Sequence, residues 1–233
     1  MNLTDKLTGR AARESDRPVP AQGMRRYLFL LGTNFWKLIG LNLLFLLFSL
    51  PVVTLPAALC ALNRAAVKLV RDGYCLVWLE FRDEFKCELF KALPIGALSL
   101  ALFGAAYYLL SLSLSNPASI YGMLFGALGL TVLFGCTAVS AYAFLMLPML
   151  SLRNRDVLSN AYRLALLGGW RTLSTLGVCF CAAALLAVLF PLSLALLAFF
   201  AFSFTQFTLC ALLNPVIQRY VIAPYEERTK CAA

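Results

Sequence analysis

Three long stretches without a charged residue constrain the fold of this chain more than any other feature. They cover residues 38–63, 92–152 and 172–218, which is 26, 61 and 47 residues. A helix that crosses a bilayer takes about 20 apolar residues, so the second and third stretches each have room for two helices. Only 13% of the 233 residues are charged, about half the share of a soluble domain. The continuous apolar runs therefore predict an all-α, polytopic helical membrane bundle.

The positions of the basic residues predict the topology. Every Lys and Arg lies in one of four blocks, at residues 6–37, 64–91, 153–171 and 219–230. The turns that we expect at 115–119 and 190–193 carry no charge. Because cytoplasmic loops are enriched in Lys and Arg, we predict a plasma-membrane protein with both termini in the cytoplasm. The basic blocks flank apolar segments, so the net charge of +9 points to the lipid bilayer as the partner and not to nucleic acid.

The first charge-free stretch has basic blocks on both sides, which conflicts with a single crossing. Pro51 and Pro56 bracket a short segment that contains Thr54, and Pro is typical of helix starts and breaks. We therefore predict a hairpin, with a first arm at 36–50 and a return arm at 56–70. Arg64 and Lys68 in the return arm are expected to extend toward the headgroups.

The return arm leaves the number of membrane segments open. A hairpin that completes both crossings gives six segments, and a re-entrant arm gives five strong segments plus a partial one. We favour six. The expected domains are a polar, basic cytoplasmic segment (1–26), one helical membrane domain (27–220) and a cytoplasmic tail (221–233). The first membrane segment is expected to act as its own insertion signal.

A cytoplasmic amphipathic helix is predicted at 74–91. Aromatic and apolar residues recur there at spacings of four, three, four and four, which places them on one helical face: Tyr74, Trp78, Phe81, Phe85 and Leu89. We take Trp78, Phe81, Phe85 and Lys86 as candidates for contact with a protein partner. Two alternatives stay open, namely that this helix lies along the membrane or packs on its own bundle.

The sequence offers no catalytic constellation. It has no His, and its eleven Asp and Glu residues lie outside the predicted spans, so we expect no enzyme, no cofactor and no metal site. Cys179 and Cys181 are two residues apart, and their side chains would point to different sides of a helix. Gly122 and Gly126 are expected to serve helix packing, within the chain rather than in a dimer. Gly168-Gly169 is expected to break the chain between a cytoplasmic helix and a membrane helix.

Four segments resemble the YesL family of bacterial multipass membrane proteins. They are Asn34–Leu38 at the first span, Leu50–Ala57 after it, Phe81–Ala92, and Asn160–Ala165 before a later span. The resemblance covers roughly residues 27–220, and Glu88 departs from it because an Asn is expected there. The resemblance implies a bacterial membrane protein of unknown biochemical activity that is associated with carbohydrate uptake.

Our functional hypothesis is a non-enzymatic accessory or regulatory membrane protein that contacts a transporter or signalling protein through its cytoplasmic helices. The alternative is a permease-like subunit of a transporter driven by a separate ATPase, because Asn160-Ala161 and Gly168 resemble the coupling loop of importer permeases. The sequence specifies neither a ligand nor an oligomeric state.

Overall fold

The computed structural model describes residues 24–115, 117, 119–150, 152–189 and 197–223. Every regular element among these residues is helical, which confirms the predicted all-α fold. The elements are α2 (Met24–Thr33), α3 (Phe35–Ser49), the 3-10 turn η1 (Val52–Thr54), α4 (Leu55–Asp72), α5 (Val77–Ser115), α6 (Ile120–Met146), α7 (Asn154–Leu167), α8 (Trp170–Val188), the π-helical η2 (Leu197–Ala201), α10 (Phe202–Ile217) and the π-helical η3 (Gln218–Ile222). The expected turn at 190–193 and most of both terminal segments lie outside the described residues.

Several helices have the length and composition of membrane spans. Five qualify alone, namely Val52–Asp72, Val77–Ser115, Ile120–Met146, Trp170–Val188 and Phe199–Ile222. The pair α2–α3 qualifies only when both helices are counted together, and it is bent by 70°. The predicted polytopic bundle is confirmed. The arm that we expected to be the firmer span, at 36–50, does not qualify alone, whereas the return arm does. The return arm is the continuous helix, whereas α3 has only 15 residues and is too short to cross alone.

A tight turn joins α3 to α4 at the residues that the sequence singled out. The hydroxyl of Thr54 lies 2.6 Å from the carbonyl oxygen of Phe48 and 2.7 Å from that of Pro51. Pro56 occupies the first turn of α4, where its missing N–H costs no hydrogen bond. Pro51, Thr54 and Pro56 therefore shape the turn between α3 and α4, and two full crossings by this pair stay a prediction.

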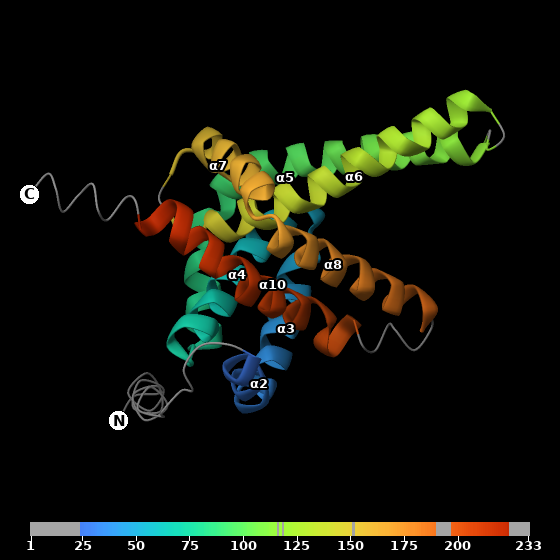
Figure 1. Ribbon diagram of the computed structural model, residues 1–233. Helices are drawn as coiled ribbons and strands as arrows, with labels where there is room; N and C mark the ends of the chain where they lie inside the picture. The colour runs from blue at the N-terminus through green and yellow to red at the C-terminus, as the bar shows by residue number, and fades with distance from the viewer. Residues whose placement is uncertain (1–23, 116, 118, 151, 190–196, 224–233) are drawn as a thin grey trace, which may run out of the picture.

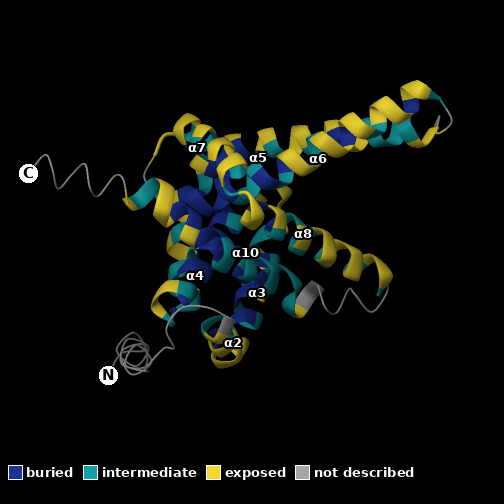
Figure 2. Cartoon of the chain, in the orientation of Figure 1, coloured by how far each residue is buried: buried dark blue, intermediate teal, exposed yellow. Residues whose placement is uncertain are grey.

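Helix α4 is the centre of the molecule. Its residues contribute to both hydrophobic clusters, one shared with α6, α7 and α10, and the other with α3 and the start of α5. Most of its buried side chains are small, among them Ala57, Ala58, Ala61, Ala65 and Ala66. Small side chains let neighbouring backbones approach closely. Figure 2 shows this buried centre and the largely exposed helices that leave it.

Helix α5 combines the predicted cytoplasmic helix and the next span. It runs without interruption for 39 residues from Val77, with Pro94 inside it, so it is roughly 58 Å long. That length is about twice the hydrocarbon thickness of a bilayer. Figure 1 shows α5 changing direction between its N-terminal part and a long arm that it forms with α6. A Pro within a helix is a common cause of such a kink.

The arm is held together by close helix packing. A Cβ atom added at Gly126 would come within 2.6 Å of Ser113 Oγ, and one at Gly129 within 3.2 Å of Leu109 Cβ. Gly122 is also buried. On its outer surface the arm exposes large apolar side chains, including Leu100, Leu114 and Leu124. A two-helix arm with such a surface is suited to lipid and not to water.

Candidate functional site

The base of the arm holds a row of ion pairs between α4 and α5, which we call the charge ladder. Glu80, Glu84 and Glu88 recur every four residues on α5, and Arg64 and Lys68 do so on α4. Residues four apart share a helix face, and the two helices run antiparallel. Lys68 therefore pairs with Glu80, and Arg64 Nε lies 3.9 Å from Glu84 Oε2.

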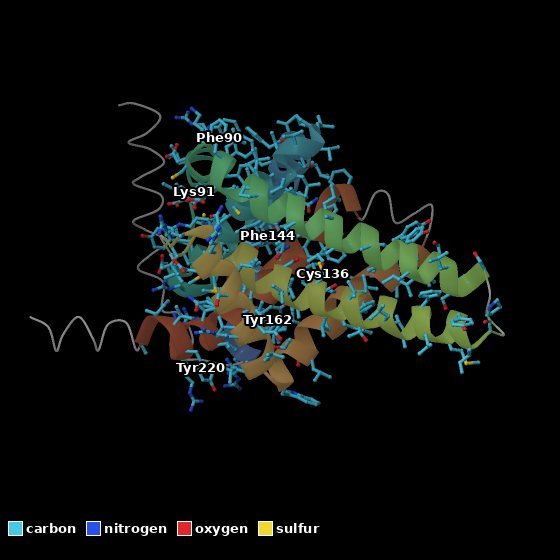
Figure 3. The ribbon with its side chains drawn as sticks, turned by 90° about the horizontal axis from the view of Figure 1, so that it is seen from above. Phe90, Lys91, Cys136, Phe144, Tyr162 and Tyr220 are labelled. Atoms are coloured by element: carbon cyan, nitrogen blue, oxygen red, sulfur yellow. The ribbon has the colours of Figure 1, made fainter. Side chains whose placement is uncertain are left out.

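Glu88 ends the ladder at its most buried position. The residue is 5% exposed, and its Oε1 accepts a hydrogen bond of 2.9 Å from Lys91 Nζ. Its Oε2 has no partner among the described residues. Buried charges are stabilised by a partner, so Lys91 is the group that makes this position possible. Figure 3 shows Lys91 at the end of the molecule away from the tip of the arm.

Side chains in and beside the charge ladder also join α4 to the end of α6, and α7 to α5. Asn63 Nδ2 donates to the carbonyl oxygen of Phe144 at 3.0 Å, and Arg64 Nη1 donates to that of Pro148 at 2.7 Å. These carbonyls belong to the last turn of α6 or follow it, where helix carbonyls lack partners in their own helix. Asn154 Nδ2 of α7 donates to the carbonyl oxygen of Lys91 at 3.0 Å. Each of these three side chains thus donates to a backbone carbonyl oxygen of a neighbouring segment.

The aromatic face of α5 divides between the interior and the surface. Phe81 is 0% exposed, and the ring centroid of Phe48 lies 5.5 Å from that of Phe81 and 4.9 Å from that of Phe85. These two candidates for partner contact therefore pack on the chain's own α3. The ring centroid of Trp78 lies 6.5 Å from that of Phe48, but Trp78 is 53% exposed.

Lys86 and Trp78 belong to an exposed row that we call the Trp78–Phe90 stripe. It consists of Trp78, Arg82, Lys86 and Phe90, spaced by four residues and all exposed. Phe90 is 81% exposed. Our sequence reasoning followed the buried face of this helix and missed Arg82 and Phe90. The four-residue spacing of two aromatic and two basic residues was the signal that would have found them.

Polar residues elsewhere in the bundle join helices. Asn42 is buried in α3, and its Oδ1 accepts a hydrogen bond of 2.9 Å from the backbone N–H of Ser203 at the start of α10. Tyr142 and Thr172 meet at 3.1 Å between their hydroxyl oxygens, beside the break at Gly168-Gly169 that separates α7 from α8. Within the part of the chain that the structure describes, no three Cys, Asp or Glu residues come together as metal ligands would.

These features define a polytopic α-helical protein of the membrane-spanning type, with its charged groups gathered at the base of the helices. A family model described as "Protein of unknown function, DUF624" matches residues 38–109. The match covers most of α3, all of η1 and α4, and most of α5, and therefore the whole charge ladder. Comparisons with curated proteins and with solved structures gave no significant match.

Proposed function

We propose that this protein is a non-enzymatic accessory or regulatory membrane protein that acts on a partner through the Trp78–Phe90 stripe. The observation that supports the proposal is the stripe itself, two exposed aromatic rings and two cations on one face of α5. Protein interfaces are enriched in aromatic residues and Arg. Lys86 and Arg82, whose Nε lies 3.6 Å from Asp83 Oδ1, favour a partner with an acidic segment at the inner membrane surface. We propose a transporter or signalling protein in that role.

The charge ladder supports a non-enzymatic role. Catalysis by acid–base or nucleophilic chemistry needs titratable groups that converge on a site open to a substrate. Glu80, Glu84 and Glu88 instead each pair with a basic side chain of the same chain. The pairs of Glu80 and Glu84 join α4 to α5, and the Glu88–Lys91 pair lies within α5; all three are structural contacts.

We further infer that α3 and α4 form a re-entrant hairpin rather than two full crossings. Pro56 of the hairpin turn lies against Gly96 of α5, only five residues beyond Lys91, the last charged residue before the arm. Figure 1 shows α3 and α4 at the base of the arm and not along it. A re-entrant hairpin, like two full crossings, leaves the basic segments before and after it on the cytoplasmic side; the position of Pro56 and the 15-residue length of α3 favour the re-entrant form.

The resemblance of four segments to YesL proteins extends this proposal to carbohydrate uptake. Under this extension the partner is a component of an uptake system in a bacterial plasma membrane. Identification of a partner with a role in carbohydrate transport would support the extension. The proposal for the Trp78–Phe90 stripe does not depend on this extension.

Affinity purification from solubilised membranes tests the stripe. A Trp78→Ala, Lys86→Ala, Phe90→Ala variant changes only exposed positions, whereas Phe81→Ala would open the core. The matched control is Tyr107→Ala, Tyr108→Ala, two exposed aromatics at the far end of the same helix. We expect the stripe variant to lose one membrane partner that wild type and control retain.

Charge reversal makes the test specific. Lys86→Glu should abolish the complex, and changing one acidic residue of the identified partner to Lys should restore it. Identical partners for wild type and the stripe variant, with both folded, would refute the proposal.

Helix α7 supports the second candidate, a permease-like subunit. It is a separate 14-residue helix between α6 and α8, with Val157, Ala161 and Leu164 buried and Tyr162 and Arg163 exposed. A cytoplasmic helix between two spans, packed on one face and free on the other, is suited to docking an ATPase. Vesicles with a candidate ATPase and labelled sugars test this. Uptake that Tyr162→Ala, Arg163→Ala abolishes would favour it, and the absence of both complex and uptake would exclude it.

A further inference from the structure

A cleft of about 920 Å³ opens between α2, the end of α4, the start of α8 and the last turns of α10. It is separate from both the charge ladder and the Trp78–Phe90 stripe. Two contacts fix its wall: the hydroxyls of Tyr27 and Thr208 meet at 2.8 Å, and the ring centroids of Tyr27 and Phe207 lie 5.6 Å apart. The cleft is therefore built by contacts between distant parts of the chain.

The lining of the cleft is positively charged. Arg26, Arg71 and Arg171 line it, against one acidic residue, Asp72. Arg26 is committed to structure, because its Nη2 donates to the carbonyl oxygens of Val70 at 3.1 Å and Arg71 at 2.7 Å at the end of α4. Arg71 and Arg171 are exposed and remain available to a ligand. Their charge favours an anion.

Asn214 adds a second and independent requirement. It lines the same cleft and is 6% exposed, and its Oδ1 has no hydrogen-bond partner among the described residues. A buried carbonyl oxygen without a donor is costly. A ligand that carries a hydroxyl beside its anionic group would supply that donor.

The position of the cleft indicates where such a ligand comes from. Arg171 is the second residue of α8 and Asp72 the last of α4, so the cleft lies where membrane helices begin and end. Basic pockets between helices at a membrane surface bind anionic lipid headgroups. We propose that this cleft binds a phosphodiester with a neighbouring hydroxyl, the headgroup of an anionic phospholipid such as phosphatidylglycerol. Arg71 and Arg171 hold the phosphate, and Asn214 accepts from the hydroxyl.

Binding of short-chain lipids to the purified full chain in neutral detergent tests this proposal. The probes are dioctanoyl phosphatidylglycerol, dioctanoyl phosphatidic acid, dioctanoyl phosphatidylcholine and soluble glycerol 1-phosphate, and their binding is followed by native mass spectrometry and by thermal shift. We expect wild type to prefer phosphatidylglycerol, and Arg71→Gln, Arg171→Gln to weaken that binding roughly thirtyfold. Asn214→Ala should reduce the preference for phosphatidylglycerol over phosphatidic acid, which lacks the hydroxyl.

Arg155→Gln, Arg163→Gln is the matched control, because it removes two exposed arginines from α7, outside the cleft. Equal losses in the control and the cleft variant would mean general surface attraction and would overturn the site. Equal binding of phosphatidylcholine and phosphatidylglycerol would also overturn it. Glycerol 1-phosphate could also bind as tightly as the lipid and lose its binding in the cleft variant. That result would overturn the proposal that the ligand is a lipid and would assign the cleft to a soluble phosphate ester.

Discussion

Gly96 of α5 lies so close to Pro56 of α4 that a Cβ atom at position 96 would stand 2.6 Å from the Cβ of Pro56. That separation is shorter than the contact distance of two non-bonded carbon atoms. The hairpin turn can therefore pack on α5 because residue 96 is a glycine. The contact also fixes the register of the two helices, and with it the depth of the hairpin.

Gly96→Ala should destabilise the protein. The added methyl group meets the rigid ring of Pro56 and forces the helices apart, a cost of about 1–3 kcal/mol for overpacking. Gly104→Ala on the same helix is the control, because its Cβ meets nothing within 4 Å and alanine favours the helix. Thermal unfolding in detergent compares them. Equal midpoints for the two variants would contradict the close contact.

The ion pair between Lys68 and Glu80 should be measurable as a coupling. Both side chains are partly buried, at 34% and 22% exposed, so a coupling energy on the order of 1 kcal/mol is expected. Lys68→Met and Glu80→Gln should each destabilise, and their double variant should cost less than the sum. The exchange Lys68→Glu, Glu80→Lys should recover most of the loss. Strict additivity in this double-mutant cycle would mean that the ladder contributes no pairwise stability.

The two cysteines near the base of the arm should differ sharply in reactivity. Cys75 is buried between α4 and α5, and this burial raises its pKa to about 12, so the thiol stays protonated and unreactive at pH 8. Cys87 is exposed on α5. Maleimide labelling of the folded protein, read by mass spectrometry, should modify Cys87 and spare Cys75 until the protein unfolds. Comparable rates at both positions would contradict the packing around Cys75.

The fold class, the break at Gly168-Gly169 and the turn at Pro51–Pro56 followed from the sequence, because charge distribution and Gly and Pro act locally. The register of α4 on α5 did not. From the sequence we expected Arg64 and Lys68 to extend to the lipid headgroups, because we considered α4 without its neighbours. Their four-residue spacing matches that of Glu80 and Glu84, and the resulting pairs join α4 to α5.

The candidate site was predicted only in part for a similar reason. The period of Trp78, Phe81 and Phe85 identified one helical face correctly, but periodicity cannot say whether a face meets a partner or the same chain. Phe48 of α3 packs on Phe81 and Phe85, and the sequence around Phe48 has no local pattern that predicts this contact. The cleft at Asn214 joins residues from α2, α4, α8, α10 and η3, which only the folded chain brings together.

Cysteine accessibility at the hairpin turn tests the proposed architecture most directly. Val53 is 68% exposed in that turn, so Val53→Cys, in a background without other cysteines, reports the side of the membrane on which the turn lies. A second variant that retains only Cys87 reports the cytoplasmic side. A membrane-impermeant maleimide applied to intact cells should label neither residue, and Cys87 should react once the cells are permeabilised. Labelling of position 53 from outside, with Cys87 still protected, would contradict the re-entrant hairpin and establish two full crossings.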